Sequence, residues 1–515
     1  MAVHNKLLIP ESINLDKLIE QGGFREIPLF KTDKLAMILF LINYIASISP
    51  NNIEKNGDFT SLNAYRLQNI IGAAYKEYLE RLVLEGVIER NKQYIVGDKN
   101  RGYRYSPKYR NDSLKSYKII NRPIQKQLQK LVKNDQSELF GYEHLTKWYN
   151  EQLEICEQDL VTEFCRLRPI ALQLRQNLRL VNLFDGLEMG HTEAKALKKE
   201  PRSFVPRLQF GVYKIQMGWF PMIVDDTSFR FHSNLTALKS ELRNALRYDN
   251  KALVSLDIKN SQPYFSLLLF QESFWQLNGN TAVPKQKAAG EAVGVKRVET
   301  LNIHQFSKLS TLLTKNSPDL YSALIMILKT PEYHLNADIV RYFELIKTGK
   351  LYEYISDQMT KSGLQVPRER QELKAGVFQT MFTANSFIGQ PDAAPKRLFK
   401  KLFPNVVALF EAIKKDESKM LPIILQTVES ELILKIITKR IALEKPDLPI
   451  FTVHDSIITI VGCEHYVLSV MEEELQRYIG AKPTISIEFY TRENLQREIE
   501  SLKAEIAEIK AMPPY

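Results

Sequence analysis

Two apolar stretches typical of buried β-strands each end at an aspartate, although the two lie far apart in the chain. Residues 252–256 lead into Asp257, and residues 449–453 lead into His454 and Asp455. The pattern after the first acid predicts a tight turn into a helix, and the pattern after the second predicts another strand and hence a hairpin. A carboxylate in such a place is costly unless it is paired or bound to a metal ion. Taken singly, each acid is better explained as an ordinary aspartate of a helix start or a turn.

Between the two acids, residues 368–387 show a helical pattern with an unusual face. Arg370, Lys374, Phe378 and Phe382 recur at every fourth position and therefore share one side of the helix. Two cations suit the phosphates of a nucleoside triphosphate, with Lys374 placed to protonate the leaving pyrophosphate. Two aromatic rings suit the sugar and the base. Without the acids, the favoured interpretation is an amphipathic helix with core aromatics and solvated cations.

The N-terminal pattern predicts three helices followed by short strands with a basic connection, which resembles a winged helix. The helices are expected at residues 34–46, 61–71 and 75–84, and the strands at 87–90, 93–96 and 103–105. Residues 1–112 are predicted to form one winged-helix-like DNA-binding module. Cations of the third helix and the wing would contact a DNA backbone: Lys76, Arg81, Lys99, Arg101 and Arg104. The alternative is a solvated charged face on a packing or protein-binding module.

Composition favours a polyanionic partner and a reducing compartment. The 515 residues predict roughly three or four domains, and 70 Lys and Arg against 60 Asp and Glu give a net charge of +10. Cys156, Cys165 and Cys463 lack zinc-site spacing and do not suit a disulfide framework. The N-terminus lacks a secretory pattern, and the apolar run at 35–48 is too short to span a bilayer, so no membrane association is expected. We expect a cytoplasmic protein of a bacterial or phage-infected cell.

The two acids and the helix between them, in this order, resemble family A DNA polymerases and the phage-type single-subunit RNA polymerases. The resemblance spans residues 229–475. Residues 257–262 are similar to motif A, in which an aspartate holds both catalytic metal ions. Residues 453–456 are similar to motif C, which carries the second aspartate. The residues from Arg370 to Phe382 match the spacing of motif B, the fingers helix that delivers the nucleotide.

Further stretches extend the resemblance to primer–template contacts. Residues 425–431 are similar to the palm helix before motif C, which implies that Gln426 contacts the minor groove of the primer–template. The stretch that contains Arg230 and Arg243 resembles the template-contacting segment before motif A. His454, in the stretch similar to motif C, is assigned to the primer–template with them.

The resemblance implies an α+β right-hand polymerase with an antiparallel palm sheet and a helical thumb and fingers, joined to the winged helix. The palm would comprise residues 226–270 and 401–515, the fingers residues 271–400, and the thumb-like region residues 113–225. Residues 276–297, rich in Gln, Gly, Ala and Lys, are expected to form a flexible insertion.

The implied chemistry is nucleotide addition assisted by two Mg²⁺ ions, with Mn²⁺ able to substitute. Asp257 and Asp455 would hold the ions, because Mg²⁺ prefers hard oxygen ligands. One ion would lower the pKa of the 3′ hydroxyl, and the other would steady the triphosphate and the leaving oxygens. The implied partners are a DNA primer–template and dNTPs.

Three positions bear on the choice of sugar, and two further positions depart from the family pattern. Gln262 takes the place of a Glu that blocks a 2′ hydroxyl in the DNA polymerases, and Phe378 matches their aromatic residue. Phe382 replaces a Tyr whose hydroxyl the RNA enzymes use to sense ribose, so all three favour dNTPs. Thr383 replaces the usual Gly, and Ser456 follows the RNA polymerases rather than the Glu of the DNA polymerases.

The sequence therefore predicts a template-directed DNA polymerase without a proofreading exonuclease. Replication or repair of a mobile element or phage-like genome is the expected role, with replication proteins as candidate partners. One alternative is a primase or RNA polymerase that uses rNTPs. A second is a winged-helix replication initiator or defence protein with a degenerate palm, and a third is a protein-primed or template-independent transferase.

Overall fold

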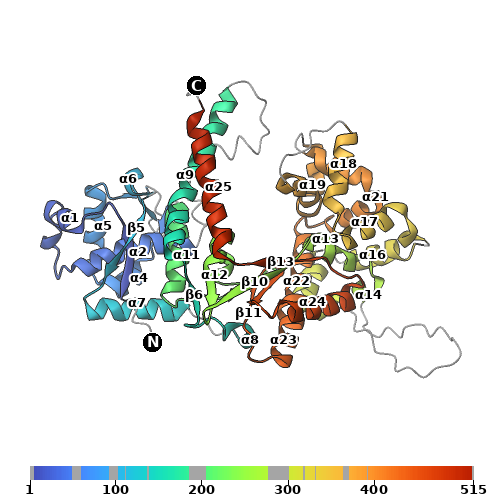
Figure 1. Cartoon of the computed structure of the whole chain (residues 1–515), viewed down its shortest axis with the longest axis horizontal. Helices are drawn as coiled ribbons and strands as arrows, with labels where there is room; N and C mark the ends of the chain where they lie inside the picture. The colour runs from blue at the N-terminus through green and yellow to red at the C-terminus, as the bar shows by residue number, and fades with distance from the viewer. Residues whose placement is uncertain are drawn as a thin grey trace.

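The computed structural model describes residues 5–48, 59–91, 102–110, 112–135, 139–184, 204–276, 301–316, 319–330, 332–362, 370–390 and 393–512. In Figure 1 the chain extends along one axis as an N-terminal part, a central sheet from which two long helices rise, and a helical part beyond the sheet. The predicted combination of many helices with an antiparallel sheet is confirmed.

The three helices expected in the N-terminal part are present. They are α2 (Thr32–Ile48), α4 (Ala64–Ile71) and α5 (Tyr75–Leu84), and the shorter helices α1 (Leu15–Gln21) and α6 (Pro107–Arg110) accompany them. Asn63 caps α4, because its side chain accepts a hydrogen bond of 3.0 Å from the backbone N–H of Arg66. The helix therefore begins where its polar start signal predicts.

A small antiparallel sheet follows these helices. Strand β4 (Gly102–Tyr105) pairs with β3 (Ile88–Arg90) on one edge and with β2 (Thr60–Ser61) on the other. The hairpin expected after the third helix is therefore present in its described strands. The strand predicted at residues 93–96 lies outside the described residues, as do Lys99 and Arg101.

The core of the N-terminal part continues past residue 112. Strand β1 (Lys6–Pro10) pairs with β5 (Leu114–Lys118), and helices α7 (Arg122–Asp135) and α11 (Phe204–Gln216) contribute buried side chains to the same core. Trp219, just after α11, packs on Tyr44 of α2 with ring centroids 4.7 Å apart. Segments expected in the thumb-like region thus complete this core.

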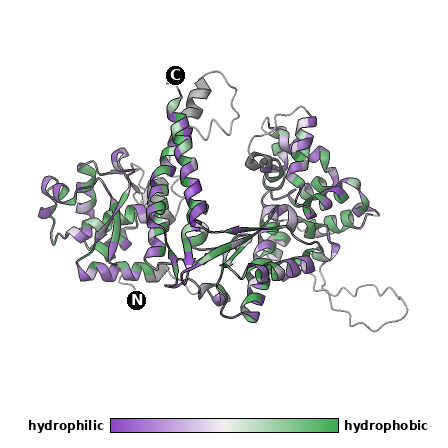
Figure 2. Cartoon of the chain, viewed as in Figure 1, coloured by the Kyte–Doolittle hydropathy of each residue, from purple (hydrophilic) through white to green (hydrophobic). Residues whose placement is uncertain are grey.

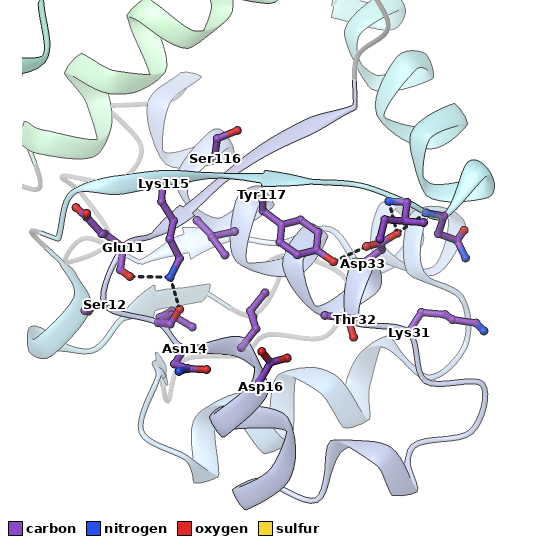
Figure 3. A pocket seen from close by; sticks show the side chains of 15 residues that line it. Glu11, Ser12, Asn14, Asp16, Lys31, Thr32, Asp33, Lys115, Ser116 and Tyr117 are labelled. Atoms are coloured by element: carbon purple, nitrogen blue, oxygen red, sulfur yellow. Dashed lines mark hydrogen bonds between the residues drawn. The ribbon is translucent and has the colours of Figure 1, made fainter. Parts of the chain in front are cut away.

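A cavity of ≈ 840 Å³ lies between the start of α2 and strand β5. Figure 3 shows Tyr117 of β5 directing its hydroxyl at Asp33, in the first turn of α2. Asp33 is buried and also accepts hydrogen bonds from the backbone N–H groups of Ile120 and Asn121. One carboxylate therefore ties the first turn of α2 to the segment that follows β5.

The central sheet has six strands, and all of its pairings are antiparallel. Its order is β11 (Ile450–Val453), β12 (Ser456–Ile460), β10 (Lys251–Ile258), β9 (Leu246–Tyr248) and β6 (Leu153–Ile155), with β13 (Ile485–Phe489) on the edge of β10 opposite β12. The tight turn between β9 and β10 places Asp249 and Asn250 at φ 50° and 60°, a left-handed conformation that matches the twist of a hairpin. Strand β10 is thus held on both edges.

Several helices contribute buried side chains to the core that this sheet begins. They are α8 (Glu143–Thr146), α12 (Asn234–Ala237), α13 (Ser261–Ser266), α22 (Met420–Ser430), α23 (Thr438–Glu444) and α24 (Glu464–Ile479). A π-helical segment, Glu431–Ile437, joins α22 to α23. Figure 2 shows apolar residues along the sheet strands and polar residues on the outer helix faces.

Two long helices stand side by side above the sheet in Figure 1. They are α9 (Gln158–Phe184) and α25 (Arg492–Ala511). Lys503 pairs with Glu163 at 2.9 Å, and Arg175 pairs with Glu505, so each ion pair joins the two helices. The buried stripe of α25 faces the same contact, which places this charged helix within the fold.

The helical part beyond the sheet carries the predicted nucleotide helix. It contains α14 (Glu272–Trp275), α15 (Ser307–Asn316), α16 (Leu320–Leu328), α17 (Ala337–Lys347), α18 (Leu351–Lys361), α19 (Arg370–Phe382), α20 (Ala394–Leu402) and α21 (Pro404–Ile413). Residues 277–297 of the predicted insertion lie outside the described residues. Within the described helices, no segment is both long enough and apolar enough to span a membrane.

Candidate active site

The register of the central sheet brings the two predicted acids together. Asp257 of β10 lies directly opposite Ser456 of β12, and Asp455 precedes Ser456 in the tip of the β11–β12 hairpin. Burial raises the pKa of Asp257 well above the usual carboxylate range, and the negative charge of Asp455 raises it further. The two side chains therefore share one electrostatic environment, although neither is fully buried.

The backbone beside each acid adopts a conformation that non-glycine residues rarely use. His454 directly precedes Asp455 at φ 54°, and Asn260, three residues after Asp257, has φ 57° and is the N-cap residue of α13. Such left-handed residues cost free energy and persist only where the surrounding structure fixes them. Here the hydroxyl of Ser456 donates to the carbonyl of Val453 at 2.8 Å and closes the hairpin turn. Both acids thus sit at sharply defined strand ends.

Helix α19 presents one of its predicted cations to these acids. The positive charge of Lys374 lowers the pKa of Asp257, against the larger effect of burial, so the ammonium group acts on that carboxylate. Lys374 itself is exposed. Arg370 is the first residue of α19, and its side chain lies outside the described residues.

The two aromatic residues of α19 form a pair whose members differ in burial. Phe378 is 38% exposed and Phe382 is partly buried, with their ring centroids 5.3 Å apart. Val377 and Met381 instead are fully buried and make the core contacts of the helix. The amphipathic alternative placed both aromatics in the core. The structure packs Phe382 against the core and leaves Phe378 exposed, with a cation nearer the other end of the helix.

Arg230 and Gln262 meet at a buried acid that the sequence did not single out. Glu429 of α22 is 1% exposed, and its Oε1 accepts hydrogen bonds from Nε and Nη2 of Arg230 at 2.9 and 2.7 Å. Its Oε2 accepts from Nε2 of Gln262. Burial raises the pKa of Glu429 to about 7, although Arg230 lowers it. Arg230 is therefore held by the protein itself.

The other predicted primer–template residues surround the same acids. Arg243 donates to the backbone carbonyls of Leu235 and Leu238 at 3.1 and 3.3 Å, and its charge lowers the pKa of Asp257. Burial, then the charge of Arg230, lowers the pKa of His454. Its ring lies edge-on to that of His232, with the ring centroids 6.2 Å apart.

Gln426 lies on α22 before Glu429 and is partly buried. It is three residues before Glu429 on the same helix, so the two lie on neighbouring turns of one face. Thr427 and Ser430, which also come from α22, line a smaller cavity of ≈ 150 Å³ with Phe229. The structure thus puts Gln426 on the helix that borders the acids, and its contact with a duplex stays a prediction.

The predicted DNA-binding cations of the N-terminal part differ in their contacts. Lys76 on α5 is exposed. Arg81 on the same helix donates to the carbonyl of Gly22 at 3.0 Å and to Glu26 at 2.9 Å. Arg104 donates to Glu89 at 2.7 Å and lies 4.3 Å from the centre of the Phe59 ring. Two of these cations are thus engaged within the protein, and Lys99 and Arg101 lie outside the described residues.

Sequence reasoning missed two acids near the centre of the site. Glu429 follows an apolar helical run, where an acid is expected to have a buried partner, and this signal was available. Glu488 of β13 lies opposite Ser255 in the sheet, and its charge raises the pKa of Asp257. Only the register of β13 reveals this second acid, because its local pattern is that of an ordinary exposed strand residue.

The possible metal ligands at this site suit a cation that keeps much of its hydration shell. Among the described residues, no cluster of three or more His, Cys, Asp or Glu side chains could hold a metal ion by itself. Mg²⁺ is commonly bound by one or two carboxylates together with water and substrate phosphates. Asp257 and Asp455 provide two such carboxylates, and their mutual repulsion is what a divalent cation would relieve. The residues present therefore fit a magnesium site that also needs the substrate.

No protein-family model matches the chain, and no curated protein matches it. Among solved structures, the POL domain of Pol1 from M. smegmatis, in complex with DNA primer-template and dNTP, is similar over 71% of this chain and 72% of that chain. The sequence identity is 11% and the TM-score is 0.37.

Proposed function

We propose that this protein is a nucleotidyltransferase that extends a DNA strand with dNTPs on a template. One observation carries the proposal: Asp455 lies in the hairpin tip next to the residue that faces Asp257, and the charges of Asp455 and of Lys374, from a distant helix, both act on the Asp257 carboxylate. Paired acids opposite a cation suit the transfer of a nucleotidyl group, in which negative charge builds up between them. A structural ion pair alone would not need the second acid.

Each residue has a role in this proposal. Asp257 and Asp455 would hold two Mg²⁺ ions, which activate a 3′ hydroxyl and neutralise the phosphates when bound. Lys374, with Arg370 beyond it, would bind the phosphates and give a proton to the leaving pyrophosphate. The exposed ring of Phe378 and its partner Phe382 would pack against the sugar and the base.

Sugar selection is proposed to depend on Gln262 and Phe382. The amide nitrogen of Gln262 is held by Glu429, and its buried Oε1 has no partner among the described residues. A side chain fixed in this way would hold its place against a 2′ hydroxyl. Phe382 has no hydroxyl with which to recognise a ribose. Both features favour dNTPs.

We propose that other parts of the chain bind the DNA substrate. Arg243, His454 and Gln426 would contact the primer–template, and Arg230 would act through its bond to Glu429. The N-terminal part would recruit the enzyme to DNA, with Lys76 as its exposed cation. We propose that the protein lacks proofreading activity and serves replication or repair of a mobile element or phage-like genome.

The test is primer extension on a defined DNA template with the whole chain and Mg²⁺. Wild-type protein and the Asp455→Asn variant are each given dNTPs, rNTPs or both. We expect extension with dNTPs by the wild type and none by the variant. Equal or better use of rNTPs would overturn the sugar assignment, and extension that survives Asp455→Asn would overturn the two-acid mechanism. Absence of any extension on a primed template would favour a binding protein with a degenerate palm.

A further inference from the structure

The end of helix α19 is surrounded by two buried lysines that the polymerase proposal does not use. Lys396 of α20 is 0% exposed, and Lys414, at the end of α21, is 3% exposed. Lysine is almost never buried to this extent unless its ammonium group is paired. The partners of these two side chains are therefore informative.

Both ammonium groups donate to the last turn of α19 and the residues just after it. Nζ of Lys414 lies 2.5 Å from the carbonyl oxygen of Thr380 and 2.9 Å from that of Thr383. Nζ of Lys396 lies 2.7 Å from the carbonyl oxygen of Ala384 and 3.1 Å from Oγ1 of Thr383. Four hydrogen bonds from two cations thus converge on one helix terminus.

This terminus is where cations are most useful to a helix. The final carbonyl groups of a helix have no partner within it and form the negative end of its dipole. Burial nevertheless lowers the pKa of both lysines, that of Lys414 to about 8. The nearby Glu411 raises both pKa values but is itself bonded to Lys400 at 2.8 Å. Burying the two ammonium groups therefore costs desolvation free energy, which suggests that they have a function at the end of α19.

The geometry of α19 supplies the reason. Thr383 and Lys374 are nine positions apart, which corresponds to about 14 Å along a helix axis. A tilt of about 10° at the anchored end would move the Lys374 position by more than about 2 Å, by the same helix dimensions. A misplacement of about 1 Å in a catalytic group can cost about 100-fold in rate. Small changes at the terminus are thus amplified at the cation.

We propose that Lys396 and Lys414 are positioning residues that fix the direction of α19 and so place Lys374 opposite Asp257. The proposal rests on the proposed nucleotidyltransferase function. Neither lysine touches the substrate in it, and both act through the helix that does.

The same arrangement explains one departure from the family pattern. Thr383 stands where a glycine is usual, and its hydroxyl donates to the carbonyl of Gln379 at 2.6 Å while accepting from Lys396. A glycine could do neither. In this chain the position has become part of the anchor.

The first experiment compares Lys414→Met and Lys396→Met with Lys400→Met in single-nucleotide incorporation. Lys400 is the matched control, since it lies on α20 but bonds to Glu411 and not to α19. We expect each buried substitution to lower kcat/KM for dNTP about ten-fold or more, and the control to stay within two-fold. Binding of primer–template without nucleotide should not change. Normal kinetics in both folded buried variants would overturn the proposal.

A double-mutant cycle separates positioning from general damage. If Lys414 acts through Lys374, then Lys414→Met should cost little further rate in a Lys374→Ala background, because the cation it places is already gone. Fully additive losses would overturn the proposal. If a methionine variant fails to fold, Thr383→Val replaces it, because this change keeps both lysines and removes one hydrogen-bond acceptor. We expect Thr383→Val to cause a smaller loss of incorporation rate.

Hydrogen exchange tests the lysine anchor at the end of α19 independently of any activity assay. In wild-type protein without nucleotide, amides in the last turn of α19 should exchange slowly, and Lys414→Met should speed them while those of α24 stay unchanged. Unchanged exchange at α19 would overturn the anchor itself. If exchange rises but the wild type incorporates no nucleotide, the anchor stands and the proposed function fails, so the two failures are distinct.

Discussion

The two sides of the candidate site are held in place by different means. Asp257 and Asp455 are fixed by a ladder of backbone hydrogen bonds in a sheet, with left-handed residues at both strand ends. Lys374 projects from α19, which is held by the buried side chains of Val377 and Met381 and by the lysine hydrogen bonds at its far end. A sheet register fixes which residues face one another, whereas a helix held by side-chain packing and a terminal anchor can change its tilt. The acids are therefore the fixed side, and the cation is the adjustable side.

The largest effect is expected at the fixed side. Asp257→Asn or Asp455→Asn should reduce nucleotide incorporation by more than about 1,000-fold, because a neutral amide is a poor ligand for a divalent cation. The melting temperature should stay the same or rise, since each change removes repulsion between two like charges. Incorporation assays and thermal unfolding of the same preparations check this. A variant that loses activity only because it unfolds would contradict the assignment.

The next largest effect is expected at the adjustable side. Lys374→Ala should lower kcat by about 100-fold, in the range found for loss of a general acid. Lys374→Arg keeps the charge but donates a proton poorly, so it should preserve dNTP binding better than turnover. The KM and kcat of the three proteins measure this. Equal loss of both parameters in the arginine variant would argue against a proton-donating role.

Substitution of Glu429 tests whether the buried acid next to the Asp257–Asp455 pair also contributes to the fixed side of the site. Because its folded pKa, about 7, lies above the ordinary value of 4.5, the folded state keeps a proton that the unfolded state releases. Stability should therefore fall as pH rises through that range. Glu429→Gln should flatten this dependence, measured as the free energy of unfolding at pH 5 and pH 8.

The same variant has a functional consequence. Loss of the carboxylate leaves Arg230 and Gln262 without their charged partner, so discrimination between dNTP and rNTP should weaken about ten-fold. Incorporation of matched dNTP and rNTP pairs measures it. If discrimination is unchanged while the pH dependence disappears, Glu429 supports the structure alone.

The smallest effect is expected at the aromatic pair. Phe382→Tyr restores a hydroxyl at a partly buried position and should raise rNTP use a few-fold without affecting dNTP use. Phe378→Tyr is the matched control, because its ring lies on the same face and contacts Phe382. A similar gain in rNTP use by both variants would show that any added hydroxyl on this helix has the effect, whatever its position.

Much of the site could be predicted because it depends on local patterns. The apolar runs before Asp257 and Asp455 define strands, and the four-residue spacing of α19 defines a face. Glu429 and the lysine anchor could not be placed in the same way. Whether Lys396 or Lys414 is buried depends on which carbonyl groups meet it in the fold, and the local pattern of a lysine on a helix is the same in either case.

The boundary expected at residue 112 shows the same limit at a larger scale. The N-terminal helices follow from their capping and periodicity, as with Asn63 at the start of α4. The pairing of β1 with β5 joins parts of the chain that share no local signal. Trp219 completes the same core from farther away still. Contacts of this kind become visible only in three dimensions.

The β1–β5 ladder also has a consequence for how this part of the chain acquires its structure. Lys6 is paired with Lys118, so the ladder closes a loop that contains all the residues between them. Closing so long a loop carries an entropic penalty that grows slowly with length, and non-local pairing slows folding. The helices between should gain structure early, and the ladder should be the late, rate-limiting step that commits them to one arrangement.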